Sequence, residues 1–418
     1  MDFLEDLQWR GLINQCSNLD GLRQRIKKGS FTFYCGFDPS APSLHLGNLL
    51  PLVTVLRLQK AGHKPIILIG GATGLIGDPS GKKEERPFLD HELVKSNTLK
   101  IKKQIETFFS LQKVNDFLIV DNYSWFKDIF YLDFLREIGK HFSVNYLLSK
   151  EWIKNRLETG ISYAEFSYSL MQAYDFYYLY KNHHCELHLG GSDQWGNIVS
   201  GIDLIRSKFN KEVFGLTLPL LLNEQGEKFG KSEKGAIWLD ANMTSPYKMY
   251  QFLINVDDKK VIQLLKLFTF IGKDEIDSIA KDLEMYPEKR QAQKILASEI
   301  VKLIYGDKQL QRAQKISEAL FYNDIRALSQ KEMEEALNDV PTFDINLKDN
   351  INIVDLLVQS KIVSSKRQAR EDIRNRAIVI NDTLCDQDNK TITKNDLLFH
   401  KYLVVRRGKK NYYLGVVK

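Results

Sequence analysis

The N-terminal half of the chain contains a stretch whose side chains could bind phosphate. In residues 34–48 an apolar run ends in a proline-containing loop, and Ser43 is placed to cap the helix that follows. The first turn of that helix holds His45, Gly47 and Asn48. A helix N-terminus offers unpaired N–H groups and a positive dipole end, and His45 and Asn48 lie on one face, where both could donate to phosphate. Gly47 leaves room for a base or a ribose.

A second stretch carries cations that suit the same phosphate chain. Lys228 and Lys231 are separated by two residues in a glycine-containing loop, so both could contact the β- and γ-phosphates and stabilise departing pyrophosphate. Taken alone, the first stretch is more typical of an ordinary capped helix, and the second of a solvated turn. The two stretches together are far more specific than either one.

A third group of polar side chains shares one face of a predicted helix. Spacings of four and three residues bring Tyr168, Gln172 and Asp175 to the same side. A phenol, an amide and a carboxylate suit a binding pocket better than a plain core, although an exposed Asp175 is the simpler alternative. In residues 190–197 another carboxylate, Asp193, follows two glycines after a short strand, where ligands bind in open α/β sheets.

Residues 70–83 come close to the pattern of a phosphate-binding loop. The pattern fails because Ile76 stands where the first glycine of such a loop is required. We predict instead a strand-to-loop segment that brings Asp78 into the pocket. The same segment makes Lys82 and Arg86 available to pyrophosphate.

The histidines and cysteines predict neither a metal site nor a disulfide framework. His184 and His188 are four residues apart, but residues 185–189 are typical of a strand, which would separate those side chains. The cysteines are dispersed without a C-x-x-C spacing, which favours reduced thiols.

The elements that must position these groups alternate between strand and helix. The short apolar runs 31–35, 64–69 and 186–189 have strand character, and helical periodicity covers 49–61 and 93–109. This alternation predicts an α/β fold with a parallel sheet and helices on both faces. Because 21 of the 25 glycines occur in the first 235 residues, we expect the ligand site in that half.

Composition and charge divide the chain further. At 418 residues, with 43% hydrophobic and 27% charged, it is too long for one core and too apolar to be disordered. The net charge is only +6, yet residues 351–418 hold 14 Lys and Arg against 7 Asp and Glu, which is a local +7. The acidic start lacks the order of a secretory signal and no apolar run has the length of a membrane span, so we expect a cytoplasmic protein without a membrane partner.

The basic segment contains a predicted amphipathic helix. Serines can cap it near residue 365, and Ala369 and Ile373 share one of its sides. Strand-like runs follow at 377–380 and 402–406. A small module with a cationic face suits a nucleic-acid backbone, although a charge run is more often only a solvated surface. The cations clustered on another side of the helix are Lys366, Arg367, Arg370 and Arg374.

The two phosphate stretches, in this order and this far apart, resemble the paired signatures of class I aminoacyl-tRNA synthetases. Those signatures read His-Ile-Gly-His and Lys-Met-Ser-Lys-Ser in their common form, against residues 45–48 and 228–232 here. Within that class the chain resembles the bacterial-type tyrosyl-tRNA synthetases nearly from end to end. Its departures from the signatures are Leu46, Asn48, Phe229 and Gly230.

The resemblance implies a role for each candidate residue. Asp175 and Tyr34 would contact the phenol group of the substrate. Phenylalanine lacks the hydroxyl and would leave both residues unpaired. Tyr168, Gln172 and Asp78 would hold the substrate ammonium. Catalysis would need no enzyme nucleophile, only alignment and positive charge on the leaving group. The transition-state donors would be His45, Asn48, Lys228 and Lys231. The ATP and adenylate residues would be Cys35, Gly36, Asp38, His45, Gly47, Asn48, Gly191, Asp193, Gln194, Lys231 and Ser232.

The resemblance also implies a Rossmann-like parallel-sheet catalytic domain, an α-helical anticodon-side domain and a small C-terminal α+β S4-like RNA-binding domain. We expect these at residues 1–244, 245–325 and 351–418, with a linker at 326–350.

The implied activity joins tyrosine to tRNA in two steps. Tyrosine and ATP would give tyrosyl-adenylate and pyrophosphate, and a ribose hydroxyl of the terminal adenosine of tRNA(Tyr) would then take the tyrosyl group. ATP would bring Mg²⁺ as a substrate ion, without a tightly bound cofactor, and a homodimer would bind tRNA across both subunits. Two alternatives stay open: a tryptophanyl enzyme, and an RNA-binding protein on a synthetase scaffold that forms no adenylate.

Overall fold

The computed structural model divides the chain into two compact units. The first comprises Met1–Thr244 and Ile254–Ile304, and the second comprises Ser245–Leu253 and Tyr305–Lys418. The residues described are 2–80, 87–114, 116–150, 153–154, 156, 160–222, 229–232, 235–322, 324–346, 350–408 and 411–417, with residues 231 and 232 described in their backbone alone.

The first unit is built on a mainly parallel sheet with strand order β1-β6-β5-β2-β3-β4. Among the described strands of this sheet, only β1, at the edge, runs antiparallel to its neighbour. The interior strand β3 is apolar after its first residue, Lys64, as expected for a strand that is covered on both faces. The α/β prediction is therefore confirmed. The strands are β1 (Gln15–Cys16), β2 (Thr32–Phe37), β3 (Lys64–Ile69), β4 (Leu118–Asp121), β5 (Cys185–Gly191) and β6 (Phe214–Leu218), with a separate short pair β7 (Lys231–Ser232) and β8 (Gly235–Ala236).

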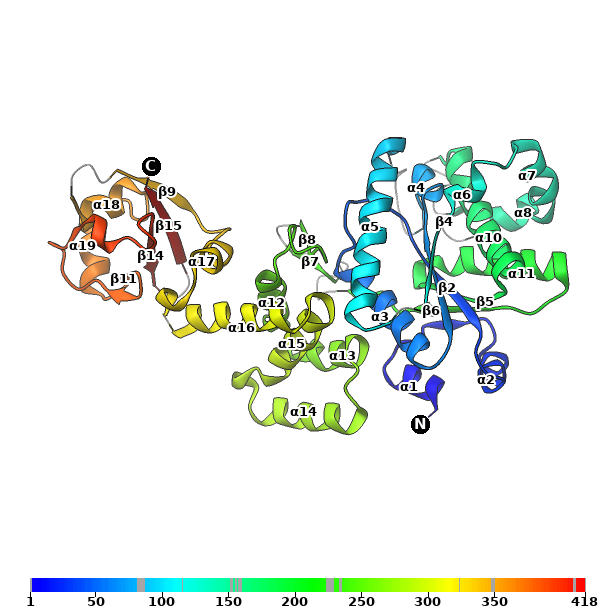
Figure 1. The fold of residues 1–418 in the computed structure, drawn as a ribbon, viewed down its shortest axis with the longest axis horizontal. Helices are drawn as coiled ribbons and strands as arrows, with labels where there is room; N and C mark the ends of the chain where they lie inside the picture. The colour runs from blue at the N-terminus through cyan, green and yellow to red at the C-terminus, as the bar shows by residue number, and fades with distance from the viewer. Residues whose placement is uncertain are drawn as a thin grey trace. The chain divides into compact units, whose positions relative to one another are not determined.

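Helices cover both faces of this sheet, with α3 and α5 on one face and α10 and α11 on the other (Figure 1). The chain winds outward from β2 to β4 in one direction and from β5 to β6 in the other, and right-handed crossovers then place the helices on opposite faces. The helices of this unit are α1 (Phe3–Trp9), α2 (Leu19–Lys27), α3 (Leu46–Lys60), α4 (Thr73–Ile76), α5 (His91–Leu111), α6 (Tyr123–Phe126), α7 (Tyr131–Glu137), α8 (Val144–Leu148), α10 (Tyr163–His183), α11 (Trp195–Phe209), α13 (Asp258–Phe268), α14 (Lys273–Met285) and α15 (Gln291–Tyr305).

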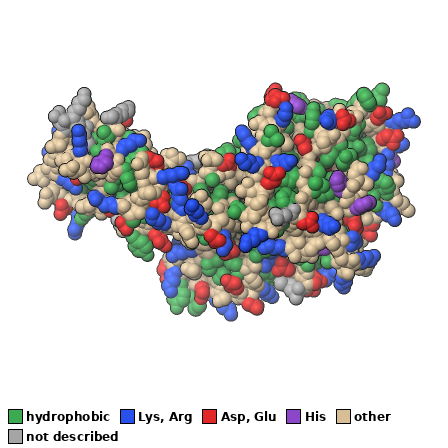
Figure 2. All heavy atoms as spheres, in the orientation of Figure 1, with side chains coloured by type: hydrophobic (Ala, Val, Ile, Leu, Met, Phe, Trp, Pro, Cys, Tyr) green, Lys and Arg blue, Asp and Glu red, His purple; other side chains and the backbone are tan. Residues whose placement is uncertain are grey.

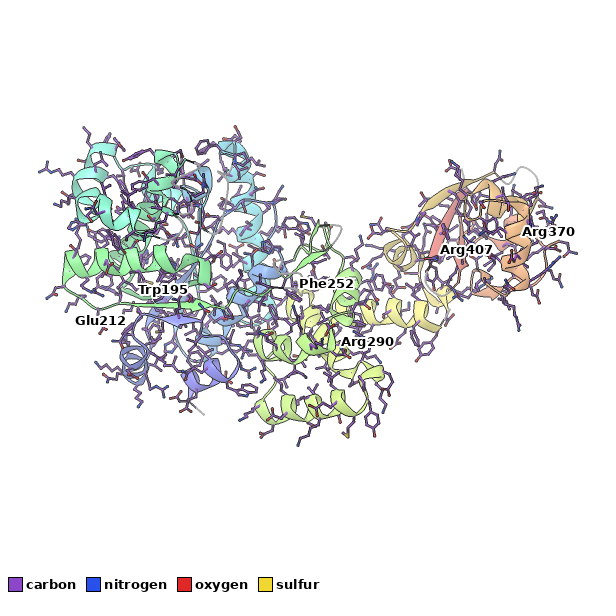
Figure 3. All side chains as sticks on the ribbon, turned by 180° about the vertical axis from the view of Figure 1, so that it is seen from behind. Trp195, Glu212, Phe252, Arg290, Arg370 and Arg407 are labelled. Carbon is purple, nitrogen blue, oxygen red and sulfur yellow. The ribbon has the colours of Figure 1, made fainter. Side chains whose placement is uncertain are left out.

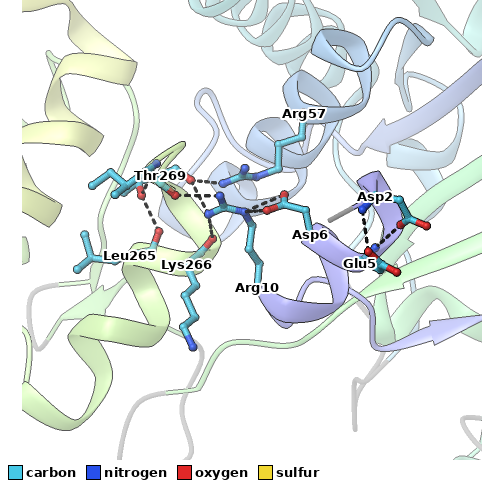
Figure 4. Close-up of polar contacts among 9 residues, drawn as sticks. Asp2, Glu5, Asp6, Arg10, Arg57, Leu265, Lys266 and Thr269 are labelled. Atoms are coloured by element: carbon cyan, nitrogen blue, oxygen red, sulfur yellow. Dashed lines mark hydrogen bonds and ion pairs between the residues drawn. The ribbon is translucent and has the colours of Figure 1, made fainter. Parts of the chain in front are cut away.

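The stretch predicted as a separate helical domain, residues 245–325, is divided between the two units. Its middle part joins the sheet unit, and two buried arginines hold it there. Arg10 donates to the carbonyl oxygens of Lys266 (3.1 Å), Thr269 (3.3 Å) and Ile271 (2.9 Å), and Arg57 also donates to that of Thr269 (Figure 4). These are the carbonyls left unpaired at and just beyond the C-terminus of α13, so the arginines act as its cap.

The second unit has a sheet with strand order β12-β11-β14-β15-β9 and helices packed on both faces. Side chains of β14 alternate between two cores. Leu403 and Val405 pack with α18 and α19, whereas Tyr402 and Val404 pack with α16 and α17. The elements are α12 (Pro246–Ile254), α16 (Asp307–Tyr322), α17 (Gln330–Ala336), β9 (Thr342–Ile345), β10 (Ile351–Asn352), α18 (Ile353–Gln359), α19 (Lys366–Arg374), β11 (Ile378–Ile380), β12 (Thr383–Leu384), β13 (Thr391–Ile392), β14 (Tyr402–Arg407) and β15 (Asn411–Val417).

The stretch predicted as a linker, residues 326–350, differs from that expectation. It contains α17, and it contains β9, which pairs in parallel with β15 from Leu414↔Thr342 to Val417↔Ile345. Its polar sequence resembled a linker because β9 is an edge strand, half of whose residues face solvent.

Figure 2 shows basic and acidic side chains interspersed over the face that it presents. In the described part of the chain, no helix combines the length and apolar character needed to span a membrane.

Candidate active site

A cavity of about 310 Å³ opens at the carboxyl ends of the central strands of the first unit. It lies between β2 and β5, where the strand order reverses and open α/β sheets bind their ligands. The cavity thus brings together side chains from sequence regions that are more than 100 residues apart. The predicted residues that line it are Tyr34, Cys35, Gly36, Asp38, His45, Gly47, Asn48, Asp78, Tyr168, Gln172, Asp175, Gly191, Asp193 and Gln194.

Asp175 reaches this cavity from α10 and is only 1% exposed, which excludes the surface alternative. Its Oδ1 accepts a hydrogen bond from Trp125 Nε1 (2.9 Å), and its Oδ2 accepts one from Asn122 Nδ2 (3.0 Å). Burial raises the pKa of Asp175 well above its ordinary value, and these two bonds oppose that rise. The Asp175 carboxyl group is therefore held in place by two donors, and its oxygens can accept further hydrogen bonds.

Neither donor to Asp175 was predicted from the sequence. Asn122 could have been predicted, because it directly follows β4, and polar residues at the carboxyl ends of parallel strands often line ligand sites. Asn122 also accepts from the Ala72 backbone N–H (2.7 Å) and donates to Thr73 Oγ1 (3.1 Å), so it joins two loops at this edge of the sheet. Trp125 carried no sequence signal, because a tryptophan in a short helix is most simply a core residue.

Two more carboxylates face the cavity near Tyr168. Asp38 accepts from Tyr168 Oη (2.8 Å) and Thr73 Oγ1 (2.8 Å). Asp78 accepts from Gln194 Nε2 (2.6 Å) and the Ser80 backbone N–H (2.9 Å). Burial, and then the charge of Asp38, raise the pKa of Asp78 to about 6. Two carboxylates that repel each other in one cavity would be stabilised by a bound cation.

Gly70 makes this arrangement of Asp38 possible. A Cβ atom at residue 70 would lie 2.0 Å from Asp38 Oδ1 and 2.3 Å from Thr73 Oγ1. Any larger residue would therefore displace the carboxylate and its donor.

Gln172 offers an acceptor of its own toward the cavity. Its Oε1 is buried, and no donor in the described ranges reaches it. A buried amide oxygen without a partner costs free energy, so a ligand N–H group in the cavity would satisfy it. Together with the nearby carboxylates, this oxygen fits a substrate ammonium group.

The N-terminus of α3 differs in detail from the prediction. His45, not Ser43, is the N-cap: its Nδ1 accepts from the Gly47 backbone N–H (3.1 Å). Asn48 Oδ1 accepts in return from the His45 backbone N–H (3.0 Å). Ser43 donates instead to the Leu44 carbonyl oxygen (2.7 Å) and accepts from the Asp240 backbone N–H. A neutral imidazole that accepts at Nδ1 carries its proton on Nε2, so His45 presents a donor there.

The second phosphate stretch runs beside the first. Leu46 N–H donates to the Ile237 carbonyl oxygen and Ile237 N–H to that of Gly230, both at 2.8 Å. Gly230 has φ +90°, and a Cβ atom on it would lie 2.9 Å from Leu46 Cβ, so glycine is needed on both counts. The backbone of Lys231 is thereby fixed next to the start of α3.

Comparisons with known proteins show which family the chain is similar to. The family "tRNA synthetases class I (W and Y)" matches residues 26–322, and a "Tyrosine--tRNA ligase SYY-like C-terminal domain" matches residues 332–415. The chain is 50% identical over 416 residues to the tyrosine--tRNA ligase of Geobacillus stearothermophilus, with 99% of each chain covered. It is 47% identical over 420 residues to tyrosine--tRNA ligase 1 of Bacillus subtilis, with 100% of each covered.

The chain belongs to the bacterial-type tyrosyl-tRNA synthetases. Its fold is similar to that of a C-terminally truncated mitochondrial tyrosyl-tRNA synthetase from Aspergillus nidulans, with TM-score 0.69 and 31% identity over 76% of this chain and 94% of the other.

Some residues that the resemblance assigns to phosphate lie outside the described residues of this synthetase. These are Lys82, Arg86 and Lys228, and the side chains of Lys231 and Ser232.

The last group of residues predicted for the adenylate, Gly191, Asp193 and Gln194, lies at and just after the end of β5. Gly191 ends the strand, and residues 192–194 form a 3₁₀ turn that leads into α11. Because Gln194 donates to Asp78, the predicted adenylate segment is hydrogen-bonded to a predicted ammonium ligand.

The predicted cationic helix of the synthetase is α19, and its N-cap is Ser365. Ala369 and Ile373 are buried and the cations are exposed, as the spacing indicated. Lys366 Nζ lies 2.6 Å from Asp355 Oδ1, and Arg370 Nε lies 3.7 Å from Asp388 Oδ2 (Figure 3 labels Arg370).

Metal ligation was not expected for this synthetase. Within the ranges that the structure describes, no three His, Cys, Asp or Glu side chains gather as they would around a metal ion.

Proposed function

We propose that the chain activates L-tyrosine with ATP in this cavity and then transfers the tyrosyl group to the terminal adenosine of tRNA(Tyr). The observation that carries the amino-acid assignment is the buried Asp175 at the cavity wall, with Tyr34 beside the same cavity. A phenol can bond to both groups, whereas phenylalanine or an aliphatic side chain would bury them without a partner.

We propose that the acidic side chains of the cavity bind the ammonium group of the substrate. A tyrosine ammonium group would offset the repulsion between Asp38 and Asp78 and would donate to Gln172 Oε1. Tyr168 holds Asp38 in place for this task. The substrate carboxylate then remains available to attack the α-phosphate of ATP.

For ATP we propose the N-terminus of α3 and the 191–194 segment. His45 Nε2–H and Asn48 would donate to phosphate, Gly36, Gly47 and Gly191 would let the nucleotide approach the backbone, and Asp193 would accept from ribose hydroxyls. Lys228 and Lys231 would neutralise the leaving pyrophosphate, with Lys82 and Arg86 as further candidates. Mg²⁺ would arrive with ATP, without a protein cage.

We propose that residues 351–418 form an S4-like module that binds tRNA through α19. The cations Lys366, Arg367, Arg370 and Arg374 support this, and the module carries the local +7 of the sequence. Residues 1–244 would carry catalysis, and helices within 245–325 would lie on the anticodon side. A tRNA ligase with reduced cysteines would work in the cytoplasm.

We also propose a homodimer. Phe130, Tyr131, Leu132 and Tyr163 are 78%, 60%, 76% and 62% exposed, and Tyr131 Oη lies 3.2 Å from Tyr163 Oη, so they form one apolar patch. A patch of this kind is typical of an interface. Phe130→Asp should halve the mass measured by sedimentation equilibrium.

Tyrosine-dependent exchange of pyrophosphate into ATP tests the first step. Equal exchange with tryptophan would instead support the tryptophanyl alternative. Binding of tRNA without any exchange would support the RNA-binding alternative, and charging of tRNA with radiolabelled tyrosine tests the second step.

A further inference from the structure

His188 lies next to Tyr34 on the adjoining strand, and no step of the proposed reaction uses it. The parallel register of β2 and β5 pairs Tyr34 with His188 directly. Tyr34 Oη lies 2.8 Å from His188 Nδ1, and the two rings stack with centroids 4.1 Å apart and planes 27° apart. His188 is 2% exposed and also lines the cavity.

The imidazole has little freedom to leave this position. Phe176 packs against both rings, with centroid distances of 5.3 Å to Tyr34 and 5.6 Å to His188. The backbone of residue 188 is held by β2 on one side and by β6 on the other. The Nδ1 to Oη contact is therefore a fixed feature of the cavity wall.

His188 is a neutral partner at physiological pH, because burial lowers its pKa to about 3. A neutral imidazole has one N–H donor and one acceptor nitrogen. Nδ1 therefore either accepts the hydroxyl proton of Tyr34 or donates its own proton to Tyr34 Oη. In both cases the contact fixes the direction of the single hydroxyl proton of Tyr34.

That direction decides what Tyr34 can offer to a substrate phenol. If Tyr34 donates to His188, its oxygen can accept from the phenol, which then accepts from a protonated Asp175. If His188 donates, Tyr34 can donate to the phenol, which then donates to the Asp175 carboxylate. Each arrangement closes an unbroken chain of hydrogen bonds from Asp175 to His188, and each requires a hydroxyl on the substrate.

We propose that His188 is a positioning residue for amino-acid selection: its Nδ1 orients the Tyr34 hydroxyl for pairing with the substrate phenol. This inference rests on the proposed tyrosine specificity. It assigns His188 to the discrimination between tyrosine and phenylalanine and leaves the chemistry on ATP to other residues.

A matched pair of variants tests the hydrogen bond separately from the packing. Asparagine and leucine have nearly the same shape, and both remove the imidazole ring, but only asparagine keeps a hydrogen-bonding atom near the place of Nδ1. In pyrophosphate exchange, His188→Leu should lower kcat/KM for tyrosine about tenfold relative to His188→Asn, because the Tyr34 hydroxyl loses its partner. The two variants should have equal kcat/KM for phenylalanine, so the tyrosine preference should fall about tenfold as well.

A double-mutant cycle identifies the route of the effect. In a Tyr34→Phe background the difference between His188→Leu and His188→Asn should disappear, because no hydroxyl is left to orient. Equal tyrosine kinetics of the two variants in the native background would overturn the proposal, and so would a difference that persists in Tyr34→Phe.

Two controls keep these outcomes interpretable. Thermal unfolding monitors the fold of each variant. If His188→Leu does not fold, His188→Ala takes its place and is compared with His188→Asn in both backgrounds: a loss seen only where Tyr34 is present supports the proposal, and an equal loss in both, or no loss, contradicts it. Absence of tyrosine exchange by the native chain would instead reject the proposed function itself.

Discussion

The cavity wall around Asp175 and the cationic helix α19 solve two recognition problems in opposite ways. Asp175 is 1% exposed, and Asn122 and Trp125 hold its carboxylate, so its orientation is set before any ligand arrives. The cations of α19 are exposed to solvent. A small substrate that must be distinguished from a near isostere requires buried, pre-oriented partners, whereas a polyanion can be bound by mobile surface charges.

The largest expected effect follows from replacing the buried acceptor. Asp175→Asn places an amide where Trp125 and Asn122 both donate, so one N–H must face another and the phenol loses a full acceptor. We expect tyrosine-dependent exchange to fall about 100-fold in kcat/KM. Asp203→Asn, at a half-exposed carboxylate on α11, is the matched control and should keep native kinetics. A fall of less than about threefold for Asp175→Asn would show that the wall does not select the substrate.

A pH effect should come next in size, since the pKa of Asp78 is raised to about 6. The carboxyl gains a proton as the pH falls through 6, and the protonated form no longer attracts an ammonium group. The KM for tyrosine should therefore rise by up to about tenfold per pH unit below 6 and be flat above about 7. In Asp78→Asn the KM should be high throughout and lose this pH dependence. A native profile that is flat from pH 5 to 7 would contradict the proposed ammonium contact.

The positive charge of α19 should affect the charging of tRNA and not the activation of tyrosine. The double variant Arg367→Glu with Arg374→Glu should lower kcat/KM for tRNA charging on the order of tenfold at low salt and reduce its salt dependence. Pyrophosphate exchange should stay native. Lys331→Glu on α17 makes the same type of charge change at another exposed lysine and serves as the control. Parallel losses of exchange and charging would mean that α19 acts through the fold.

The smallest effect is expected at the paired cation of the same helix. Lys366 is 60% exposed and its partner Asp355 is 39% exposed, and an exposed ion pair contributes less than about 1 kcal/mol to stability. Lys366→Gln should therefore shift the denaturant midpoint very little. A shift equivalent to more than about 2 kcal/mol would show that the C-terminal module depends on its surface charges.

The architecture of the second unit also limits one obvious experiment. Truncation after residue 350 removes β14 and β15, whose Tyr402, Val404 and Leu414 cover Ile316 and Met333. Surface substitutions on α19 are the cleaner way to separate RNA binding from folding.

Local patterns were sufficient for the principal strands and helices around the site. The strand 64–69 was predicted with its observed bounds, because a buried parallel strand is a continuous apolar run. The helix that carries Asp175 was also predicted, since spacings of three and four residues place its polar side chains on one face. Strand β9, within the stretch predicted as a linker, was missed because this edge strand is too polar and too short to stand out.

The amino-acid sequence by itself determined the paired phosphate stretches, the polar face of residues 168–175 and the location of the basic charge. Only the tertiary structure decided that His45 caps its own helix, that Asn122 and Trp125 hold Asp175, and that His188 stacks on Tyr34. For the contacts of Asp175 and of Tyr34 the physical reason is sequence distance. Residues 34 and 188 meet only because β2 pairs with β5 in a particular register, and no local pattern encodes that pairing.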